Sequence, residues 1–420
     1  MNEYDSELLE SVLAGDGYLM VSAPEQADLI VVNTCSVRQK AEERAMIRIN
    51  ELASLKKTRP EIKLVVAGCM ARRVGEGIRT KIPAIDYVIG PDHIPDIPSI
   101  VAEDGSQRIL IGDKFADEQA PASIRNTGPA TYVAISRGCE NFCSYCIVPF
   151  VRGPFRSRPY KNIVDHVRRL AESGIKDITL LGQNVNSYCD GMVDFPALLK
   201  LLEQVAPPRL RFLTSHPKDF SDDLLDCFAG IPRLCHSLHL PLQSGSDTVL
   251  NMMNRNYTID HYRGLIDKLR KAAPDITLTT DLIVGFPGET EAYFQSTLQA
   301  VHEIGFDAAF MFRYSARPGT SAAALYDDVP EAEKIERLNR LIGLQQIISE
   351  KKNERWIGKS LEILIHGKSR REPVMPKGKT RGGQSVLVID CPDLKIGQMI
   401  MGRISSTTAK TLFAAFEKAL

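Results

Sequence analysis

Hydrophobic and polar positions along the first hundred residues follow two alternating patterns. The amphipathic, helix-like stretches are residues 3–13, residues 38–57 and a segment that begins at Met70. The continuous apolar runs are residues 28–34, 62–68 and 86–89. A strand that is apolar throughout is covered on both faces, and amphipathic helices between such strands supply the cover. The pattern therefore predicts an open parallel sheet with helices on both faces, which we assign to residues 1–115.

A second series of apolar runs follows a polar stretch of linker composition at residues 116–129. Its six strand candidates are residues 132–136, 177–181, 210–214, 236–240, 276–285 and 307–314. Helical patterns separate them, notably at residues 162–172, 195–205 and 291–304. Repeated βα units in this number predict a partial (β/α)6 barrel over residues 128–352. Chemistry is expected at the carboxyl ends of its strands.

The pattern changes after a long helical stretch at residues 331–359. Short strand-like runs at residues 361–365, 385–389 and 398–404 surround a loop rich in glycine and lysine. This spacing predicts a small β-barrel of five strands over residues 353–418. The expected fold class is therefore α/β, with an open parallel-sheet domain, a central partial barrel and a small C-terminal β-barrel.

Composition narrows the functional classes. Lys plus Arg and Asp plus Glu number 52 each, so the chain has no formal net charge. This balance argues against a general polyanion binder but allows a local basic patch. No apolar run approaches the roughly 18 residues of a membrane helix, and the N-terminus does not resemble a signal peptide, so we expect a cytoplasmic protein without membrane contact. The nine cysteines are then expected to serve as metal ligands or catalytic groups rather than disulfides.

Three cysteines form a C-x3-C-x2-C triplet directly after the first strand of the barrel series. Cys139, Cys143 and Cys146 lie in the segment SRGCENFCSYC. Three thiolates can hold three irons of a 4Fe–4S cluster and leave the fourth iron open to chelate S-adenosylmethionine. Gly138 allows the backbone to wrap closely around a cluster. The alternatives are three unrelated thiols or a zinc site, although zinc prefers four ligands and no partner pair lies nearby.

Two further cysteines follow strands of the N-terminal sheet. Cys35 follows the run VVNT, and Cys69 follows the run LVVAG. Both therefore fall at the carboxyl edge of one parallel sheet, where ligand-binding loops converge. The alternative is that they are incidental core thiols. Cysteines without comparable placement are expected to be structural, and these are Cys189, Cys227, Cys235 and Cys391.

The sequence resembles the radical S-adenosylmethionine (radical SAM) superfamily, and more narrowly the methylthiotransferases, over essentially its whole length. The resemblance rests on IVPFVRGPFRSRP (147–159), LLGQNVNSY (180–188), LPLQSGSD (240–247), DLIVGFPGET (281–290) and FRYSARPGT (312–320). It implies that Gly182 and Gln183 contact the methionine end of S-adenosylmethionine. Gln243 and Ser244 would reach its ribose or carboxylate, and Gly285 would let the backbone approach the adenine. The alternative for the GFPG glycines is a simple turn.

The resemblance also implies a second 4Fe–4S cluster. In this family the N-terminal domain binds it through three cysteines, two of which lie in segments like NTCSVRQKAEER and AGCMARR. These segments contain Cys35 and Cys69. The third cysteine normally lies just upstream of a segment like MNEYDSE, where this chain begins. We therefore expect the sequence to be truncated at its N-terminus and the second cluster to lack one ligand.

The C-terminal module resembles a TRAM domain, a small β-barrel found on RNA-modifying enzymes. Its basic residues within fourteen positions are Lys368, Arg370, Arg371, Lys377, Lys379 and Arg381. Such a cluster can bind RNA phosphates, and its alternative is a solvated polar loop. The segments NTCSVRQKAEER and GQNVNSY resemble the MiaB branch, which acts on tRNA; the ribosomal-protein branch would show NTCGF and GQDTT. The resemblance thus implies methylthiolation of carbon 2 of N6-isopentenyladenosine at position 37 of tRNA.

The same resemblance implies partners and leaves two other functions open. The expected partners are tRNA and an electron donor such as a flavodoxin or ferredoxin, and the expected state is a monomer. One alternative is methylthiolation of a ribosomal protein. The other is a catalytically impaired iron–sulfur protein that binds RNA.

Overall fold

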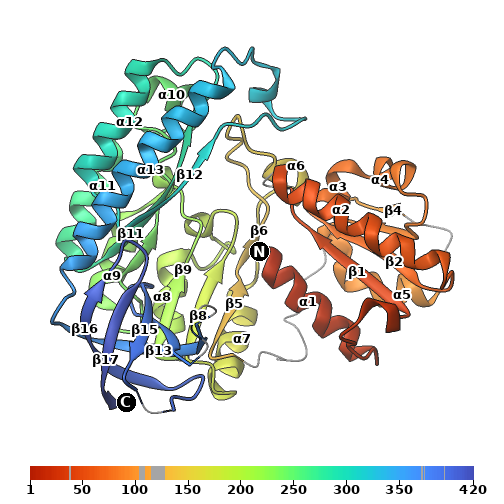
Figure 1. Ribbon diagram of the computed structural model, residues 1–420, viewed down its shortest axis with the longest axis horizontal. Coiled ribbons are helices and arrows are strands. Elements are labelled where there is room, and N and C mark those ends of the chain that lie inside the picture. Colours follow the sequence, from red (N-terminus) through yellow and green to blue (C-terminus); the bar gives the residue numbers. More distant parts are fainter. Residues whose placement is uncertain (37–38, 104–108, 115–127, 370–371, 373, 392) are drawn as a thin grey trace.

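The computed structural model describes residues 1–36, 39–103, 109–114, 128–369, 372, 374–391 and 393–420. Figure 1 shows three units along the chain: an N-terminal unit on the right, a central unit, and a small barrel below it that ends the chain. These units confirm the predicted three-part α/β fold. Most of the predicted linker at residues 116–129 lies outside the described residues. None of the described helices is both long and apolar enough to span a membrane.

The N-terminal unit is a parallel sheet with strand order β1-β2-β3-β4. Its strands are β1 (Leu29–Thr34), β2 (Lys63–Gly68), β3 (Tyr87–Ile89) and β4 (Ile109–Leu110). Its helices are α1 (Asn2–Gly15), α2 (Gln39–Ser54), α3 (Cys69–Val74), α4 (Glu76–Lys81) and α5 (Ile97–Ala102). One apolar core lies under α1 and α5, and a second lies under α2, α3 and α4, so both faces are covered as predicted. The pattern does not predict β4, because two residues are too few to show a period.

The central unit contains six parallel strands in two groups of three, β5-β8-β9 and β10-β11-β12. The strands are β5 (Ala130–Ala134), β8 (Asp177–Leu181), β9 (Arg209–Phe212), β10 (Ser237–His239), β11 (Thr277–Val284) and β12 (Ala308–Arg313). The helices are α6 (Val148–Arg152), α7 (Tyr160–Glu172), α8 (Phe195–Glu203), α9 (Asp222–Gly230), α10 (Asp247–Met252), α11 (Ile259–Ala272), α12 (Glu291–Ile304) and α13 (Glu331–Glu354). A parallel bridge between Leu210 and Leu234 joins the two groups. The predicted partial (β/α)6 barrel is thereby confirmed.

The first strand of the barrel ends earlier than the sequence pattern predicts. β5 stops at Ala134, and the chain continues into β6 (Ser136–Arg137). β6 pairs in antiparallel fashion with β7 (Arg156–Ser157). This short ribbon joins the two ends of the segment that carries the cysteine triplet, and so it fixes the base of the candidate site.

The C-terminal unit is a closed barrel with strand order β13-β14-β15-β17-β16. Its strands are β13 (Ser360–Lys368), β14 (Pro376–Thr380), β15 (Ser385–Ile389), β16 (Met399–Thr407) and β17 (Leu412–Ala419). The sequence pattern predicted a loop rich in glycine and lysine before β15. This prediction is wrong in part, because some of the segment forms β14. Buried and exposed residues alternate along β14, and a Cβ on Gly378 would lie 2.5 Å from Ile363. A proline and a glycine lower the strand propensity, yet the barrel interior requires small residues there.

The predicted RNA-binding residues have different environments. Lys368, Lys377 and Lys379 are exposed on β13 and β14. Arg381 instead attaches the barrel to the central unit, where its guanidinium donates to the carbonyls of Pro208 at 3.2 Å and Pro232 at 2.5 Å. These contacts attach the two units to each other, and RNA binding by Arg381 stays a prediction. The remaining two, Arg370 and Arg371, lie outside the described residues.

A buried arginine of the central unit completes this attachment. Arg209 begins β9 and is fully buried. It donates to the Glu362 carboxylate at 3.0 Å and to the carbonyl of Lys379 at 2.8 Å. The small barrel therefore docks at the amino ends of the central strands, away from the carboxyl ends where chemistry is expected.

Replacement of Arg209 by methionine is expected to loosen the C-terminal barrel. The change leaves Glu362 and a buried carbonyl without their donor, at a cost of about 3 kcal/mol. Hydrogen exchange of the β14 amides should therefore become faster than in the wild type. Arg403→Met changes an exposed arginine of the same barrel and should leave the exchange rates unaltered. Unchanged β14 exchange in Arg209→Met would contradict this docking role.

Candidate active site

The cysteine triplet occupies the loop between β6 and α6. Cys143 is buried, whereas Cys139 and Cys146 are partly exposed. The Cys146 amide donates to the Cys143 carbonyl at 2.9 Å, which makes a tight turn between these two ligand positions. Burial, followed by the neighbouring Cys143, raises the pKa of Cys146 to about 12. Three cysteines gathered in one partly buried loop form a site suited to positively charged irons.

Glycine is required immediately before the triplet. Gly138 has a φ of 75°, and a Cβ there would lie 1.9 Å from the carbonyl oxygen of Pro154. The Cys139 amide donates to the Gly153 carbonyl at 3.3 Å, so the two sides of the loop touch. The predicted close wrapping of the backbone is confirmed at this position.

A segment after α10 holds the triplet loop from the outside, and sequence reasoning did not single it out. The Ser144 amide donates to the Met253 carbonyl at 3.0 Å. Asn254 donates to the Phe142 carbonyl at 3.0 Å, and the buried guanidinium of Arg255 lies 3.3 Å from the Cys143 sulfur. No local motif links residues so far apart in the chain, so only the tertiary structure reveals this support.

Two of the predicted cofactor residues, Gln183 and Gln243, lie just after strands of the central unit. Gln183 follows β8, and Gln243 follows β10 with a left-handed φ of 69°. The side-chain oxygens of both are buried and have no hydrogen-bond partner among the described residues. Buried polar atoms are normally paired, so these positions fit a polar ligand such as the methionine end of S-adenosylmethionine.

The structure adds two residues to this polar group. Ser136 on β6 and His216 after β9 also carry buried atoms without a partner in the described part of the chain, namely Oγ and Nε2. Burial, with Arg255 and Lys218 adding, lowers the pKa of His216 to about 2, so the imidazole is neutral. Because its Nδ1 accepts from the Lys218 amide, its proton resides on Nε2, which can donate to a ligand.

The other three predicted cofactor residues pack closely against other residues of the protein. A Cβ on Gly182 would lie 2.3 Å from Ser136 Oγ. Ser244 is fully buried, and its hydroxyl lies 3.2 Å from that of Thr297 on α12. Its contact with the ribose or carboxylate of S-adenosylmethionine stays a prediction. A Cβ on Gly285 would lie 2.3 Å from the Lys334 side chain, which explains the glycine by helix packing. Approach of Gly285 to an adenine stays a prediction.

Cys35 and Cys69 lie side by side at the edge of the N-terminal sheet. The register pairs Thr34 with Gly68, so the two following cysteines extend from neighbouring strand ends as predicted. Gly68 has a φ of 96°, and a Cβ there would lie 2.5 Å from the Thr34 carbonyl oxygen. This close approach brings the two cysteine-bearing turns together.

The described residues contain no three His, Cys, Asp or Glu side chains that converge on a single metal ion. A cubane cluster does not require such convergence, because each cysteine binds a different iron. The triplet loop, its glycine and the adjacent unpaired polar atoms therefore fit a 4Fe–4S cluster with bound S-adenosylmethionine. At the other site, the described thiols are those of Cys35 and Cys69.

Comparisons with known proteins agree with this site. A model of the radical SAM superfamily matches residues 133–301, and a model of an uncharacterized protein family, UPF0004, matches residues 1–90. A tRNA-2-methylthio-N(6)-dimethylallyladenosine synthase from Thermodesulfovibrio yellowstonii is 42% identical over 415 residues, which cover 98% of this chain and 95% of the relative. A protein of the same name from Geotalea uraniireducens is 45% identical over 397 residues, which cover 92% of this chain and 90% of that relative.

This chain belongs to the family of the tRNA-2-methylthio-N(6)-dimethylallyladenosine synthases. Its fold is also similar to that of more distant proteins. The radical S-adenosylmethionine methyltransferase TsrM from Kitasatospora setae superposes with a TM-score of 0.59 at 15% identity, covering 76% of this chain and 74% of that one. The members of the synthase family that we compared are thus similar over almost their full length, whereas TsrM shares the fold alone.

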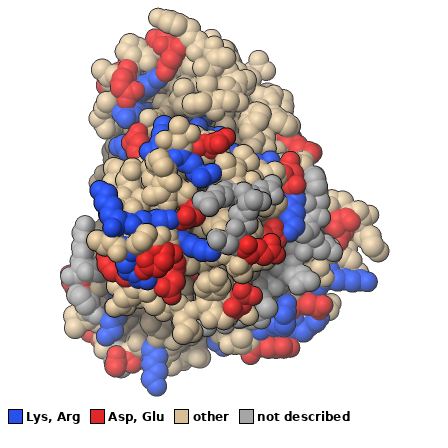
Figure 2. All heavy atoms as spheres, turned by 90° about the vertical axis from the view of Figure 1, so that its right-hand side faces the viewer, with Lys and Arg blue, Asp and Glu red and all other residues tan. Residues whose placement is uncertain are grey.

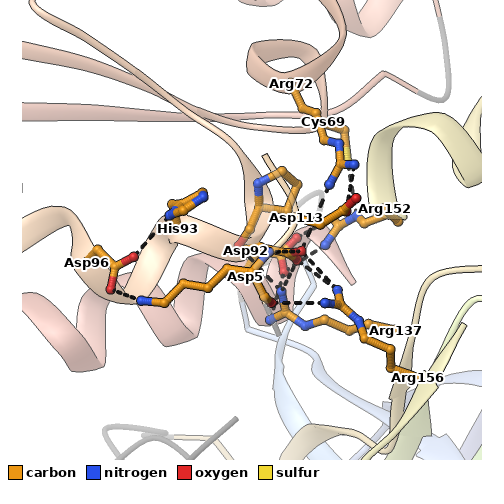
Figure 3. A network of polar contacts seen from close by, with 12 residues as sticks. Asp5, Cys69, Arg72, Asp92, His93, Asp96, Asp113, Arg137, Arg152 and Arg156 are labelled. Carbon is orange, nitrogen blue, oxygen red and sulfur yellow. Dashed lines mark hydrogen bonds and ion pairs between the residues drawn. The ribbon is translucent and has the colours of Figure 1, made fainter. Parts of the chain in front are cut away.

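A buried ionic network beside Cys69 joins the N-terminal unit to the central unit (Figure 3). Arg152 ends α6, immediately after the triplet loop, and its Nε lies 3.0 Å from the Cys69 sulfur. The same guanidinium forms a bidentate salt bridge with Asp5 of α1, which is fully buried. Burial raises the pKa of the Cys69 thiol, and the neighbouring Arg152 opposes that shift. One arginine therefore connects the central unit to both α1 and Cys69.

A second ion pair, between Arg156 and Asp92, fixes the orientation of the N-terminal unit. Arg156 of β7 binds both oxygens of Asp92, at 3.1 and 2.9 Å, and Asp92 lies in a 3-10 helix after β3. Apolar contacts accompany these ion pairs, because Cys69 packs with Ile147 and Val151 beside the triplet. The sheet edge with Cys35 and Cys69 is thereby held next to the triplet loop.

A cleft of about 450 Å³ lies between the two units. The central unit lines it with Cys139, Phe142 and Phe150, and the N-terminal unit contributes Arg72 and Asp113. The cleft gives direct access to a ligand of the predicted cluster.

Proposed function

We propose that this protein adds a methylthio group to carbon 2 of N6-isopentenyladenosine at position 37 of tRNA, through a radical SAM reaction. The observation that carries the proposal is the 40–45% identity to synthases of that name over nearly the whole chain. The cysteine triplet beside a cleft supports it chemically. The names of these relatives do not favour the alternative of a ribosomal-protein substrate.

The triplet residues Cys139, Cys143 and Cys146 would hold the first cluster. A 4Fe–4S cluster held there would supply one-electron reduction of S-adenosylmethionine, which is the chemistry needed to activate an otherwise inert ring carbon. The polar groups of Gln183, Gln243 and His216 would bind and orient the amino-acid end of S-adenosylmethionine. Because these groups are largely buried, bulk water would be kept away from the reacting atoms.

The N-terminal site would serve the sulfur half of the reaction. Cys35 and Cys69 would be ligands of a second 4Fe–4S cluster, and Arg152 would hold Cys69 in place. The short path between Cys69 and the triplet loop supports transfer of sulfur to a base that enters the cleft.

The proposal extends to partners and location. The exposed Lys368, Lys377 and Lys379 would contact tRNA phosphates, together with Arg370 and Arg371. Electrons would come from a flavodoxin or ferredoxin, and the protein would act as a monomer in the cytoplasm, where tRNA is modified.

Nucleoside profiling tests this function. The chain is expressed in a bacterium that lacks its own synthase, and digested tRNA is examined by mass spectrometry. The wild type should produce the 2-methylthio nucleoside, whereas Cys69→Ala should form 5′-deoxyadenosine in vitro without methylthiolated product. The reason is that Cys69 lies outside the triplet that binds S-adenosylmethionine. Wild-type protein that forms deoxyadenosine but leaves tRNA unmodified, or that modifies a ribosomal protein instead, would contradict the proposal.

A further inference from the structure

We propose that Phe142 and Phe150 form a stacking platform for an unstacked base of the tRNA anticodon loop. This inference rests on the proposed function and identifies how the substrate enters the cleft. The platform is defined by these two rings, which come from the triplet loop and from α6.

The two rings form an exposed aromatic pair at the cleft. Phe142 is 53% exposed and Phe150 is 52% exposed. Their centroids lie 6.3 Å apart with the ring planes at 73°, an edge-to-face arrangement. Single exposed apolar residues are common, but two adjacent exposed phenylalanines that line a cleft indicate a binding surface.

The backbone holds Phe142 in a conformation that a bulky residue rarely adopts. Its φ is 45°, in the left-handed region. Asn254 maintains this conformation by donating to the carbonyls of Phe142 at 3.0 Å and Asn141 at 3.3 Å. The consequence is that Cys143 is buried while the preceding ring is exposed. The fold therefore holds Phe142 in an unfavourable backbone conformation, which is typical of functional positions.

The N-terminal unit contributes an ion pair, Arg72 with Asp113, to the lining of the cleft. Arg72 pairs with Asp113 through Nη2 at 2.7 Å. Its Nη1 is buried and has no hydrogen-bond partner within the described residues, although Asp92 lies 3.9 Å from it. Exposed aromatic rings in a cleft that also contains polar side chains suit a nucleobase, because the base can stack on a ring while its edge meets polar groups.

The charge distribution favours a base over phosphates at this place. Acidic and basic side chains are interspersed on the face shown in Figure 2, in keeping with equal numbers of both over the chain. The cleft itself is lined by Glu140 as well as Arg72. Binding there would therefore depend on stacking more than on attraction of the RNA backbone.

The test measures the affinity of reconstituted full-length protein for a fluorescent anticodon stem-loop RNA. Two RNAs are compared, one with unmodified adenosine and one with the dimethylallyl group. Phe142→Ala and Phe150→Ala should each weaken binding about tenfold, because base–aromatic stacking has that magnitude. Phe142→Tyr should restore most of the affinity, since it retains the ring, whereas Phe142→Leu should not. Asn254→Ala should weaken binding through the loss of ring placement.

The matched control is Leu19→Ala, which removes an 85% exposed side chain beyond the far end of α1 and should leave RNA affinity unchanged. The ratio of wild-type to Phe142→Ala affinity should stay constant between low and high salt, because stacking releases no counterions. Iron content and melting temperature identify any variant that has failed to fold.

Several results would overturn the platform. The first is an RNA affinity of Phe142→Ala equal to that of the wild type. The second is an RNA affinity of Phe142→Leu equal to that of the wild type. A loss confined to the dimethylallyl RNA is a third, because it would show that the rings bind the prenyl chain. The proposed function is judged separately from wild-type nucleoside products. Tight RNA binding without methylthiolation would contradict that function and leave the platform standing.

Discussion

Replacement of Cys143 by alanine is expected to abolish formation of 5′-deoxyadenosine and of methylthiolated product together. Cys143 is the buried member of the triplet and lies between the other two ligand positions. Loss of an outer-shell partner of a metal ligand already costs about 10- to 100-fold, so loss of a ligand itself should reduce both products at least about 100-fold. Iron content should fall with them.

The matched control is Cys189→Ala, which removes an exposed thiol outside both cysteine sites. It should retain iron, deoxyadenosine formation and product. Normal cleavage of S-adenosylmethionine by Cys143→Ala would contradict the assignment of the triplet. Comparison of Cys143→Ala with Cys69→Ala separates the radical step from the sulfur step. Only the triplet should be needed for cleavage of S-adenosylmethionine.

Asp5→Asn is expected to cause the largest loss of stability among the single substitutions considered. The change keeps the volume of the side chain but leaves the Arg152 guanidinium, itself only 4% exposed, without its anionic partner. Breaking a buried ion pair by removal of one charge costs about 3 to 5 kcal/mol. The melting temperature of the N-terminal unit should fall, and protease cleavage of α1 should become faster.

Two comparisons make this result specific. Asp165→Asn disrupts an exposed pair with Arg168 and should alter stability by less than about 1 kcal/mol. The double variant Asp5→Asn with Arg152→Met should recover much of the loss, because neither charge is then buried alone. Equal effects of Asp5→Asn and Asp165→Asn would contradict the role of the buried pair.

The same ion pair gives a pH dependence with a definite sign. Burial by itself would raise the pKa of Asp5, but Arg152 and then Arg137 outweigh it and hold the pKa below its ordinary value of 3.8. A carboxyl with a depressed folded-state pKa stabilises the fold above its unfolded-state pKa. This contribution is expected to be complete at neutral pH and to be lost as the pH falls from about 4 through the lower folded-state value. Acid unfolding of Asp5→Asn should lack this component.

Much of the fold could be predicted from local patterns. The six central strands were predicted from apolar runs of five to ten residues with helical patterns between them, and all six are found within a few residues of their predicted positions. β14 and β17 were not predicted, for opposite reasons. The segment PKGKT contains strand breakers, whereas LFAAFEKA has helix-forming alanine, glutamate and lysine. Closure of the barrel overrides both local preferences.

The candidate site shows the same division. The spacing of Cys139, Cys143 and Cys146, and the positions of Cys35 and Cys69 after strands, could be read directly from the chain. Arg381 and Ser244 were expected to bind RNA and cofactor, and within the protein their partners are Pro208, Pro232 and Thr297. A side chain's sequence neighbours do not reveal which distant group it will meet.

The sequence by itself determined those features of the protein that depend on residues close together along the chain. These are the βα repeats, the ligand spacing of the triplet and the glycine that lets the loop close. The tertiary structure alone decided how the two cysteine sites are related. Arg152 and Asp5 lie 147 positions apart, and Asn254 holds a loop more than one hundred residues upstream. Such contacts arise from the packing of whole units against one another, because burial of a charge or a carbonyl requires a partner wherever the fold supplies one.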